Sequence, residues 1–257
     1  MLREFRKKLI HSFEQSQYFR EKYLQLAIFC SNHGVEHPFS AGRVKTERGF
    51  RKQDSHDPQR MPYLYTKYDD AVGLLFEDVL PFLEKDSNIL EIGCNAGRNL
   101  HHLFSKGYKN LTGIEIGIEA EKVMKEIFPE VHKVATFIVG NAYEELCKLP
   151  SSHYDLVFTH GVLVNIAPKW NGIFKEIARV SKSYVLTLES EGSYKAYPRD
   201  FEKMFKRVNY KQILYKLYRA GNNRRILAPD FTGYDKLFNN TIRLFVPIKK
   251  GIPLLLK

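Results

Sequence analysis

Residues 89–99 read Ile-Leu-Glu-Ile-Gly-Cys-Asn-Ala-Gly-Arg-Asn, and this stretch decides the fold of the 257-residue chain. The apolar run Ile89–Ile92 predicts a short strand, and the residues after Gly97 predict a helix. A ligand that presses against the backbone between the two requires small residues, which Gly93 and Gly97 provide. Asn95 stands where many such loops carry a middle glycine, and Asn tolerates left-handed dihedrals better than most residues.

Strand and helix patterns alternate after this turn. Apolar runs predict further strands at 111–116, 135–139, 154–159 and 184–189, and helical spacing predicts helices at 98–105, 118–128 and 169–180. This order predicts an α/β fold with a mainly parallel sheet and helices on both faces. Residues 211–219 and 241–248 alternate apolar and polar side chains, which predicts two antiparallel strands and a seven-stranded sheet in total.

The spacing of the glycines separates two classes of cofactor. A dinucleotide-binding turn needs G-x-G-x-x-G, and in that register Asn95 and Arg98 stand where the second and third glycines belong. The register that fits has Glu91 two residues before Gly93 and Gly97 four residues after it. It resembles motif I of the Rossmann-like, class I S-adenosylmethionine methyltransferases. Cys94 is interpreted as a small residue of this loop.

Two further strand ends agree with that resemblance. Glu115 ends the second strand, followed by Ile116, and its carboxylate can accept hydrogen bonds from both ribose hydroxyls of a nucleoside. The alternative is a surface glutamate at a strand end. Asn141 and Ala142 follow the third strand, where the family usually carries Asp beside adenine. Asn141 can still accept from the exocyclic amine, although Gly-Asn is also an ordinary turn.

The segment from Asp155 to Ile166 resembles motif IV of the same family, so that four motifs occur in order over residues 88–190. The strings LEIGCNAGRN, LTGIEI and FTHGVLVNIAP more closely resemble the pseudaminic-acid-biosynthesis-associated methylases, which are found among bacterial surface-glycan genes. Leu188-Glu189 and the segment 197–201 also resemble that group. The group tends to read G-V-L-x-H-I after the fourth strand, and this chain has Asn165 in place of the His.

The resemblance implies S-adenosyl-L-methionine as the cofactor. The residues expected to contact it are Glu91, Gly93, Cys94, Asn95, Gly97, Glu115, Ile116, Asn141, Ala142 and Thr159.

His160 and Glu189 are the candidate catalytic bases. They stand at the carboxyl ends of the fourth and fifth strands, the edge at which open α/β sheets bind ligands. Transfer of an activated methyl group needs alignment and, for a hydroxyl acceptor, removal of a proton. His160 could instead be a polar wall of the cofactor pocket, and Glu189 could pair with an arginine of the tail. No carboxylate–His cluster predicts a metal site.

Basic residues are concentrated in the flanks of the chain. Net charge is +5 over residues 1–60, −5 over 61–194 and +11 over 195–257. Arginines with tyrosines suit a phosphate or carboxylate beside a sugar ring, so Tyr194, Tyr197 and Arg199 are expected to bind the substrate. The same residues would suit an RNA backbone, or simply form solvated loops.

The chain is expected to divide into two parts. Residues 1–62 are expected to form an N-terminal helix and basic loop that act as a lid or contact a partner. Residues 63–257 are expected to form the cofactor-binding domain with a substrate-side insert at 190–240. Apolar spacing predicts a basic amphipathic helix over residues 1–33, which packs on its own domain or on a second subunit, or lies on a membrane surface. Three scattered cysteines and the lack of a long apolar run favour a cytoplasmic protein without a membrane span.

The sequence therefore predicts an S-adenosylmethionine-dependent methyltransferase. The predicted acceptor is a small or glycan molecule, which is expected to be anionic and to be methylated at oxygen in bacterial cell-surface carbohydrate biosynthesis. One alternative is an RNA methyltransferase that uses the basic flanks. The other is a non-catalytic module that binds the cofactor, which is suggested by Asn165 at the position where the related group has His.

Overall fold

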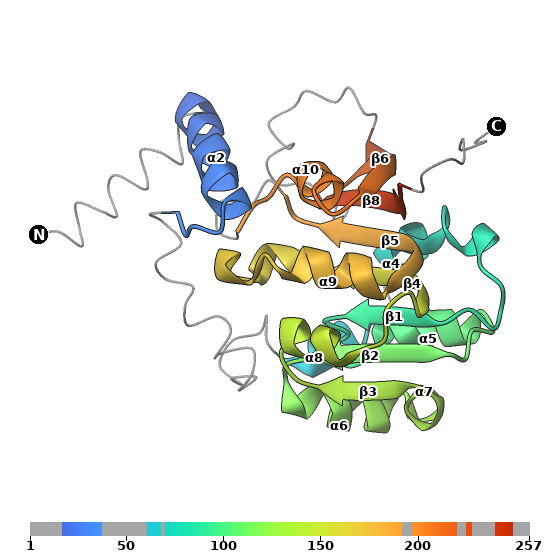
Figure 1. The fold of residues 1–257 in the computed structure, drawn as a ribbon. Coiled ribbons are helices and arrows are strands. Elements are labelled where there is room, and N and C mark those ends of the chain that lie inside the picture. The colour runs from blue at the N-terminus through green and yellow to red at the C-terminus, as the bar shows by residue number, and fades with distance from the viewer. Residues whose placement is uncertain are drawn as a thin grey trace, which may run out of the picture.

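An eight-stranded sheet forms the centre of the computed structural model, which describes residues 17–37, 61–67, 70–191, 197–219, 225–227 and 240–248. The strand order is β3-β2-β1-β4-β5-β8-β6-β7 (Figure 1). The first five are parallel, and β8, β6 and β7 continue the sheet with antiparallel pairings. The strands are β1 (Ile89–Ile92), β2 (Leu111–Glu115), β3 (Thr136–Val139), β4 (Tyr154–His160), β5 (Ser181–Glu189), β6 (Tyr210–Arg219), β7 (Arg225–Leu227) and β8 (Asn240–Pro247).

Helices cover both faces of this sheet (Figure 1). They are α2 (Gln17–Asn32), η2 (Pro62–Tyr65), α4 (Asp70–Phe76), η3 (Leu80–Phe82), α5 (Arg98–Ser105), α6 (Ile118–Ile127), α7 (Pro129–Val134), α8 (Ala142–Lys148), η4 (Leu163–Asn165), η5 (Pro168–Trp170), α9 (Ile173–Val180) and α10 (Phe201–Lys206). Alternate residues of each strand face opposite sides. Ile89 therefore joins the core beneath α4 and α5, whereas Leu90 joins the core beneath α8, α9 and α10.

The predicted α/β class is confirmed, and all seven predicted strands are present. The three-residue β7, which pairs with the end of β6, adds an eighth. Helix α4 ends at Phe76 and is followed by the short helix η3, whose Pro81 lacks a backbone N–H and cannot continue an α-helix.

The C-terminal end of α2 packs on the domain that follows it. Asn171 donates from Nδ2 to the Ser31 carbonyl oxygen at 2.6 Å, and Arg207 donates from Nη1 to the Asn32 carbonyl oxygen at 2.8 Å. Gly34, at φ +79°, ends the helix. Packing on its own domain, one of the expected alternatives, thus holds for this end, while residues 1–16 lie outside the described part of the chain. No helix in the described segments has the length and apolar character to cross a bilayer.

Candidate active site

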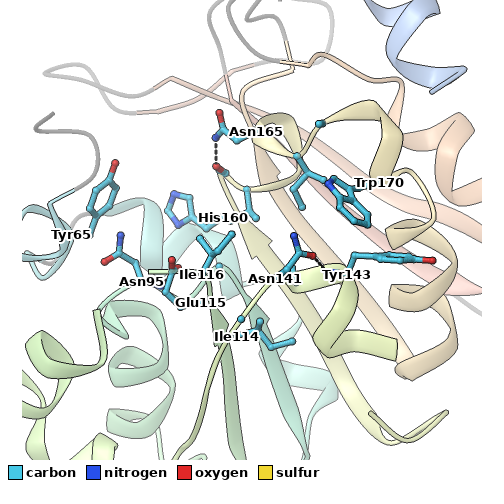
Figure 2. Close-up of a pocket in the computed structure, with 17 residues that line it drawn as sticks. Tyr65, Asn95, Ile114, Glu115, Ile116, Asn141, Tyr143, His160, Asn165 and Trp170 are labelled. Atoms are coloured by element: carbon cyan, nitrogen blue, oxygen red, sulfur yellow. Dashed lines mark hydrogen bonds between the residues drawn. The ribbon is translucent and has the colours of Figure 1, made fainter. Parts of the chain in front are cut away.

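Two adjoining cavities lie at the carboxyl ends of the parallel strands, and Figure 2 shows the first of them. We call the first, of about 260 Å³, the inner cavity; it is bounded chiefly by the ends of β2, β3 and β4 and by the segment 165–170. The second, of about 230 Å³, is the outer cavity, and it is bounded by the loop after β1, the start of α5 and the end of β5. The residues that line both are Tyr65, Gly93, Asn95, His160 and Gly161.

The loop after β1 has the backbone that its glycines predict. Gly93, Asn95 and Gly97 all have positive φ, at +74°, +46° and +80°. A Cβ atom at Gly93 would overlap the Val162 side chain, and one at Gly97 would lie 2.9 Å from Met124 Sδ. Both glycines are therefore needed for dihedrals and for space, and Asn95 occupies the left-handed region as expected.

Glu115 is held at the end of β2 by two backbone N–H groups. Its Oε2 accepts from Asn95 N at 2.9 Å, and its Oε1 accepts from Gly117 N at 2.8 Å. Burial raises the pKa of this carboxyl, and the N–H donors oppose that rise. A carboxylate has about four acceptor sites, so two remain for a ligand. Ile116 lines the same cavity.

Asn141 and Ala142 also line the inner cavity. Asn141 Oδ1 accepts from Tyr143 N at 2.9 Å and from Glu144 N at 3.4 Å, and so caps helix α8. Figure 2 shows the Asn141 amide nitrogen turned toward the cavity. Asn141 Oδ1, which was expected to accept from an adenine amine, thus accepts from the first backbone N–H groups of α8. The side chain instead presents its amide N–H donors to the cavity.

Glu91 lies at the floor of the outer cavity and is 1% exposed. Its Oε1 accepts from Asn99 Nδ2 at 2.6 Å, whereas its Oε2 and Asn99 Oδ1 are buried with no hydrogen-bond partner in the described part of the chain. Burial raises the pKa of Glu91 to about 8. Asn99 Oδ1 and, in the ionised carboxylate, Glu91 Oε2 are thus buried acceptors without donors, which favours a ligand that carries N–H groups. Cys94 lines this cavity too, with its sulfur against Gly113.

His160 ends β4 and lines both cavities, as a candidate catalytic group should. Arg98, the first residue of α5, places Nη2 3.5 Å from His160 Nδ1. Tyr65 of η2 faces the same region (Figure 2).

Glu189 is not a cavity residue, which contradicts its expected role as a base. It is 0% exposed and lines neither cavity. Its Oε1 accepts from Val162 N and Leu163 N, both at 3.1 Å, and its Oε2 accepts from Val164 N at 3.2 Å. Thr159, expected at the cofactor, is buried as well and donates to Glu189 Oε1 at 2.8 Å. Both side chains lie beneath the loop after β4, where Glu189 accepts from the backbone N–H groups of residues 162–164 and Thr159 donates to Glu189.

Arg199 and Tyr197 are likewise buried, at 1% and 2% exposure, so their expected role in substrate binding is wrong. Arg199 donates from Nη1 to the Leu163 carbonyl oxygen and from Nη2 to the Ile166 carbonyl oxygen, each at 2.7 Å. The Tyr197 N–H donates to the Val164 carbonyl oxygen at 2.7 Å. Tyr197 and Arg199 therefore hold the loop that lines the cavity, and neither side chain enters the cavity. Tyr194 lies outside the described residues.

Three aromatic residues of the site were not predicted from the sequence. Tyr65, Tyr143 and Trp170 line the inner cavity, and the Tyr143 and Trp170 ring centroids lie 5.4 Å apart. The residues belong to separate short elements, so no local spacing connects them. The described segments hold no group of three His, Cys, Asp or Glu side chains that could bind a metal ion.

The chain is similar to known methyltransferases in sequence and in fold. Residues 90–185 match the family model described as a methyltransferase domain. The fold resembles magnesium protoporphyrin IX methyltransferase from Synechocystis PCC 6803 with bound S-adenosylhomocysteine (12% identity, TM-score 0.58, covering 80% of this chain and 99% of that one). It also resembles a TehB-like S-adenosylmethionine-dependent methyltransferase from Corynebacterium glutamicum (17% identity, TM-score 0.55, 76% and 97%).

A third similar structure is geranyl diphosphate C-methyltransferase from Streptomyces coelicolor A3(2) (10% identity, TM-score 0.52, 69% of this chain and 78% of that one). None of the curated proteins matches the chain. The structural likenesses establish the class I fold, and the matched domain establishes the reaction class. Residues 90–185 are therefore a methyltransferase domain, and the chain is an enzyme with the Rossmann-like class I fold of S-adenosylmethionine-dependent methyltransferases.

Proposed function

We propose that the cofactor lies across both cavities, with its ribose on Glu115 and its ammonium on Glu91. The buried Glu91 Oε2, which has no donor in the described segments, carries this proposal, because an ammonium supplies the missing N–H groups. Glu115 keeps acceptor sites for two ribose hydroxyls. Gly93 and Asn95 line both cavities and leave room for the atoms between these two groups.

The adenine is assigned to the end of the inner cavity formed by Asn141, Ala142 and Tyr143. The Asn141 amide nitrogen donates there to a ring nitrogen, since its oxygen caps α8. Cys94 and Gly97 support the loop, whereas Ile116 contacts the nucleoside. Thr159 is not included, because it is buried beneath the site.

When bound, the cofactor supplies a methyl group activated by its sulfonium. The residues of this chain align the acceptor with that methyl group and exclude water. His160, which lines both cavities, lies where the ribose side and the ammonium side of the site meet, and we assign it to the acceptor.

We propose that the acceptor is a small or glycan molecule that is methylated at oxygen in bacterial cell-surface carbohydrate biosynthesis. The resemblance of the three strings around residues 90–99, 111–116 and 158–168 to surface-glycan methylases supports this acceptor. Asn165 replaces the His of that group, and its Nδ2 donates to the Gly161 carbonyl oxygen at 2.8 Å. The Asn165 side chain thus stabilises its own loop. This role does not require Asn165 to act as a base, so other residues of the site can serve the reaction.

Calorimetric titration with S-adenosylmethionine and S-adenosylhomocysteine tests the cofactor site. We expect both to bind the wild-type protein and to lose about tenfold or more in affinity in Glu115→Gln, since an amide replaces one acceptor of the ribose hydroxyls. Glu119→Gln, an exposed substitution on α6, is the matched control. Absence of binding to the wild-type protein would overturn the proposal.

The charge of +11 over residues 195–257 favours a second candidate, methylation of RNA. Binding to an RNA duplex or hairpin would then weaken steeply as salt rises, because phosphate contacts release counterions. Binding that is absent or insensitive to salt would remove this candidate.

A further inference from the structure

Helix α2 ends against the segment that forms one wall of the inner cavity. This segment ends at Trp170, which lines the cavity beside Tyr143 (Figure 2). The next residue, Asn171, donates from Nδ2 to the carbonyl oxygen of Ser31, in the last turn of α2, at 2.6 Å. A Cβ atom at Gly34, which ends α2, would lie 3.7 Å from the carbonyl oxygen of residue 168. The end of α2 is therefore in direct contact with the cavity wall.

The Asn171 amide connects α2 to the loop 161–166. While its Nδ2 donates to α2, its Oδ1 accepts from Arg199 Nε at 3.0 Å. A carbonyl oxygen only accepts and a guanidinium only donates, so these two partners fix the orientation of the amide. Arg199 in turn donates to the carbonyl oxygens of residues 163 and 166, each at 2.7 Å. A chain of hydrogen bonds thus leads from α2 to the backbone of the loop that lines the cavity.

A second set of contacts joins the same two parts independently of that amide. Asn32, the last residue of α2, accepts at Oδ1 from Asp200 N at 3.2 Å. The ring of His37, which is 1% exposed, packs edge-on against the Tyr197 ring, with 6.2 Å between the centroids. Tyr197 N donates to the Val164 carbonyl oxygen at 2.7 Å. The segment that holds the cavity loop is thus itself held by α2 and by the turn that follows it.

We propose, as an inference that rests on the proposed cofactor site, that docking of α2 and binding of the cofactor are coupled, with Asn171 as the positioning residue between them. The helix has a docked state, with the contacts above, and an undocked state, in which Asn171 Nδ2 and the Ser31 carbonyl oxygen bond to water. Docking holds the wall in the conformation that lines the inner cavity, so the cofactor binds the docked state more tightly. By linkage, the cofactor then strengthens docking by the same factor.

Hydrogen exchange in the full chain measures this coupling. We expect saturation with S-adenosylhomocysteine to slow exchange of the α2 amides of residues 25–32 by about fivefold or more, the lower end of typical coupling between two sites. Helix α7 precedes β3, whose other end meets the cavity, so its amides serve as an unchanged reference. Unchanged exchange in α2 at saturation would overturn this inference alone. Absence of S-adenosylhomocysteine binding would overturn the cofactor site and this inference together.

Ala27→Glu tests the coupling in the reverse direction. Ala27 is 0% exposed and lies one turn before Ser31, which is also 0% exposed, so a glutamate there displaces the buried face of α2. Gln25→Glu introduces the same charge at an exposed position of the same helix and is the control. We expect Ala27→Glu to weaken calorimetric binding of S-adenosylhomocysteine by the factor found for wild-type exchange, and Gln25→Glu to keep wild-type affinity. Wild-type affinity in Ala27→Glu, together with fast exchange throughout α2, would contradict the coupling.

Asn171→Asp breaks only the α2 half of the connection. The carboxylate still accepts from Arg199 Nε, but it cannot donate to the Ser31 carbonyl oxygen. We expect faster exchange in α2 and a lower affinity for S-adenosylhomocysteine. Because both substitutions undo the same docking, the combined variant with Ala27→Glu should bind S-adenosylhomocysteine no more weakly than Ala27→Glu alone. Losses of affinity that add in full would show that Asn171 acts on the cavity by another route, and would overturn its role as the positioning residue.

Discussion

Glu189 and Arg199 hold the same loop, residues 161–166, by complementary sets of hydrogen bonds. Glu189 accepts from the backbone N–H groups of residues 162, 163 and 164, and Arg199 donates to the carbonyl oxygens of residues 163 and 166. Several residues of this loop line the inner cavity. An anion and a cation that never reach the cavity therefore determine the shape of its wall.

Removal of the Glu189 carboxylate should destabilise the protein. Glu189→Ala leaves three backbone N–H groups and the Thr159 hydroxyl without an acceptor, and we expect a loss of about 3 kcal/mol or more in the free energy of unfolding. Affinity for S-adenosylhomocysteine should fall as well. Chemical denaturation measures the first effect and calorimetry the second. Glu119→Ala, an exposed glutamate, should change stability by less than about 0.5 kcal/mol.

The pH dependence of that loss has a defined sign. Burial raises the pKa of Glu189 from 4.5 to about 7 in the folded protein. A raised carboxyl pKa stabilises the folded state most below pH 4.5, and the contribution is lost as pH rises through 7. The difference in unfolding free energy between wild type and Glu189→Ala should thus be larger at pH 5 than at pH 8. A difference that grows with pH would mean that the carboxyl titrates below its ordinary pKa.

Replacement of Arg199 by lysine should lower the stability of the protein. Arg199→Lys keeps the charge but cannot reach the Asn171 side chain and the carbonyl oxygens of residues 163 and 166 together. We expect a loss of about 2–3 kcal/mol in unfolding free energy, since buried carbonyl groups lose charge-assisted donors. Lys203→Arg, an exposed exchange on α10, is the control. Equal stability of the two variants would show that Arg199 contributes charge alone.

The sequence predicted the part of the site that depends on backbone. Gly93, Asn95 and Gly97 have the dihedrals that their residue types favour, and the acidic residues at the ends of β1 and β2 line the cavities. It did not predict the roles of Glu189 and Arg199. Polar residues near the carboxyl edge of a sheet have the same pattern whether they enter the cavity or support its wall. Their depth is fixed by the loop 161–166, whose path the sequence alone does not specify.

Gly93→Ala should abolish cofactor binding. The added Cβ would overlap the Val162 side chain at a backbone with φ +74°, so both the loop and the cavity wall must shift. Gly107→Ala is the matched control, because Gly107 has φ +93° but its nearest neighbour would lie 3.7 Å from the Cβ. We expect Gly107→Ala to lose stability and keep affinity for S-adenosylhomocysteine in calorimetry. Comparable affinity in both variants would contradict the close approach at Gly93.

Cofactor affinity should rise with pH between 6 and 7.5. Burial raises the pKa of Glu91 to about 8, so its carboxyl is mostly protonated at pH 6–7 in the ligand-free protein. An ammonium favours the ionised carboxylate, and binding must then release a proton.

Calorimetry in buffers of different ionisation enthalpy should detect that proton, and the affinity should increase by up to about tenfold per pH unit. In Glu91→Gln, whose amide still meets Asn99, the affinity should be lower and lack this slope. If the affinity of Glu91→Gln rose with pH as steeply as that of the wild-type protein, the released proton would come from another group. Glu91 would then not be the residue that binds the ammonium.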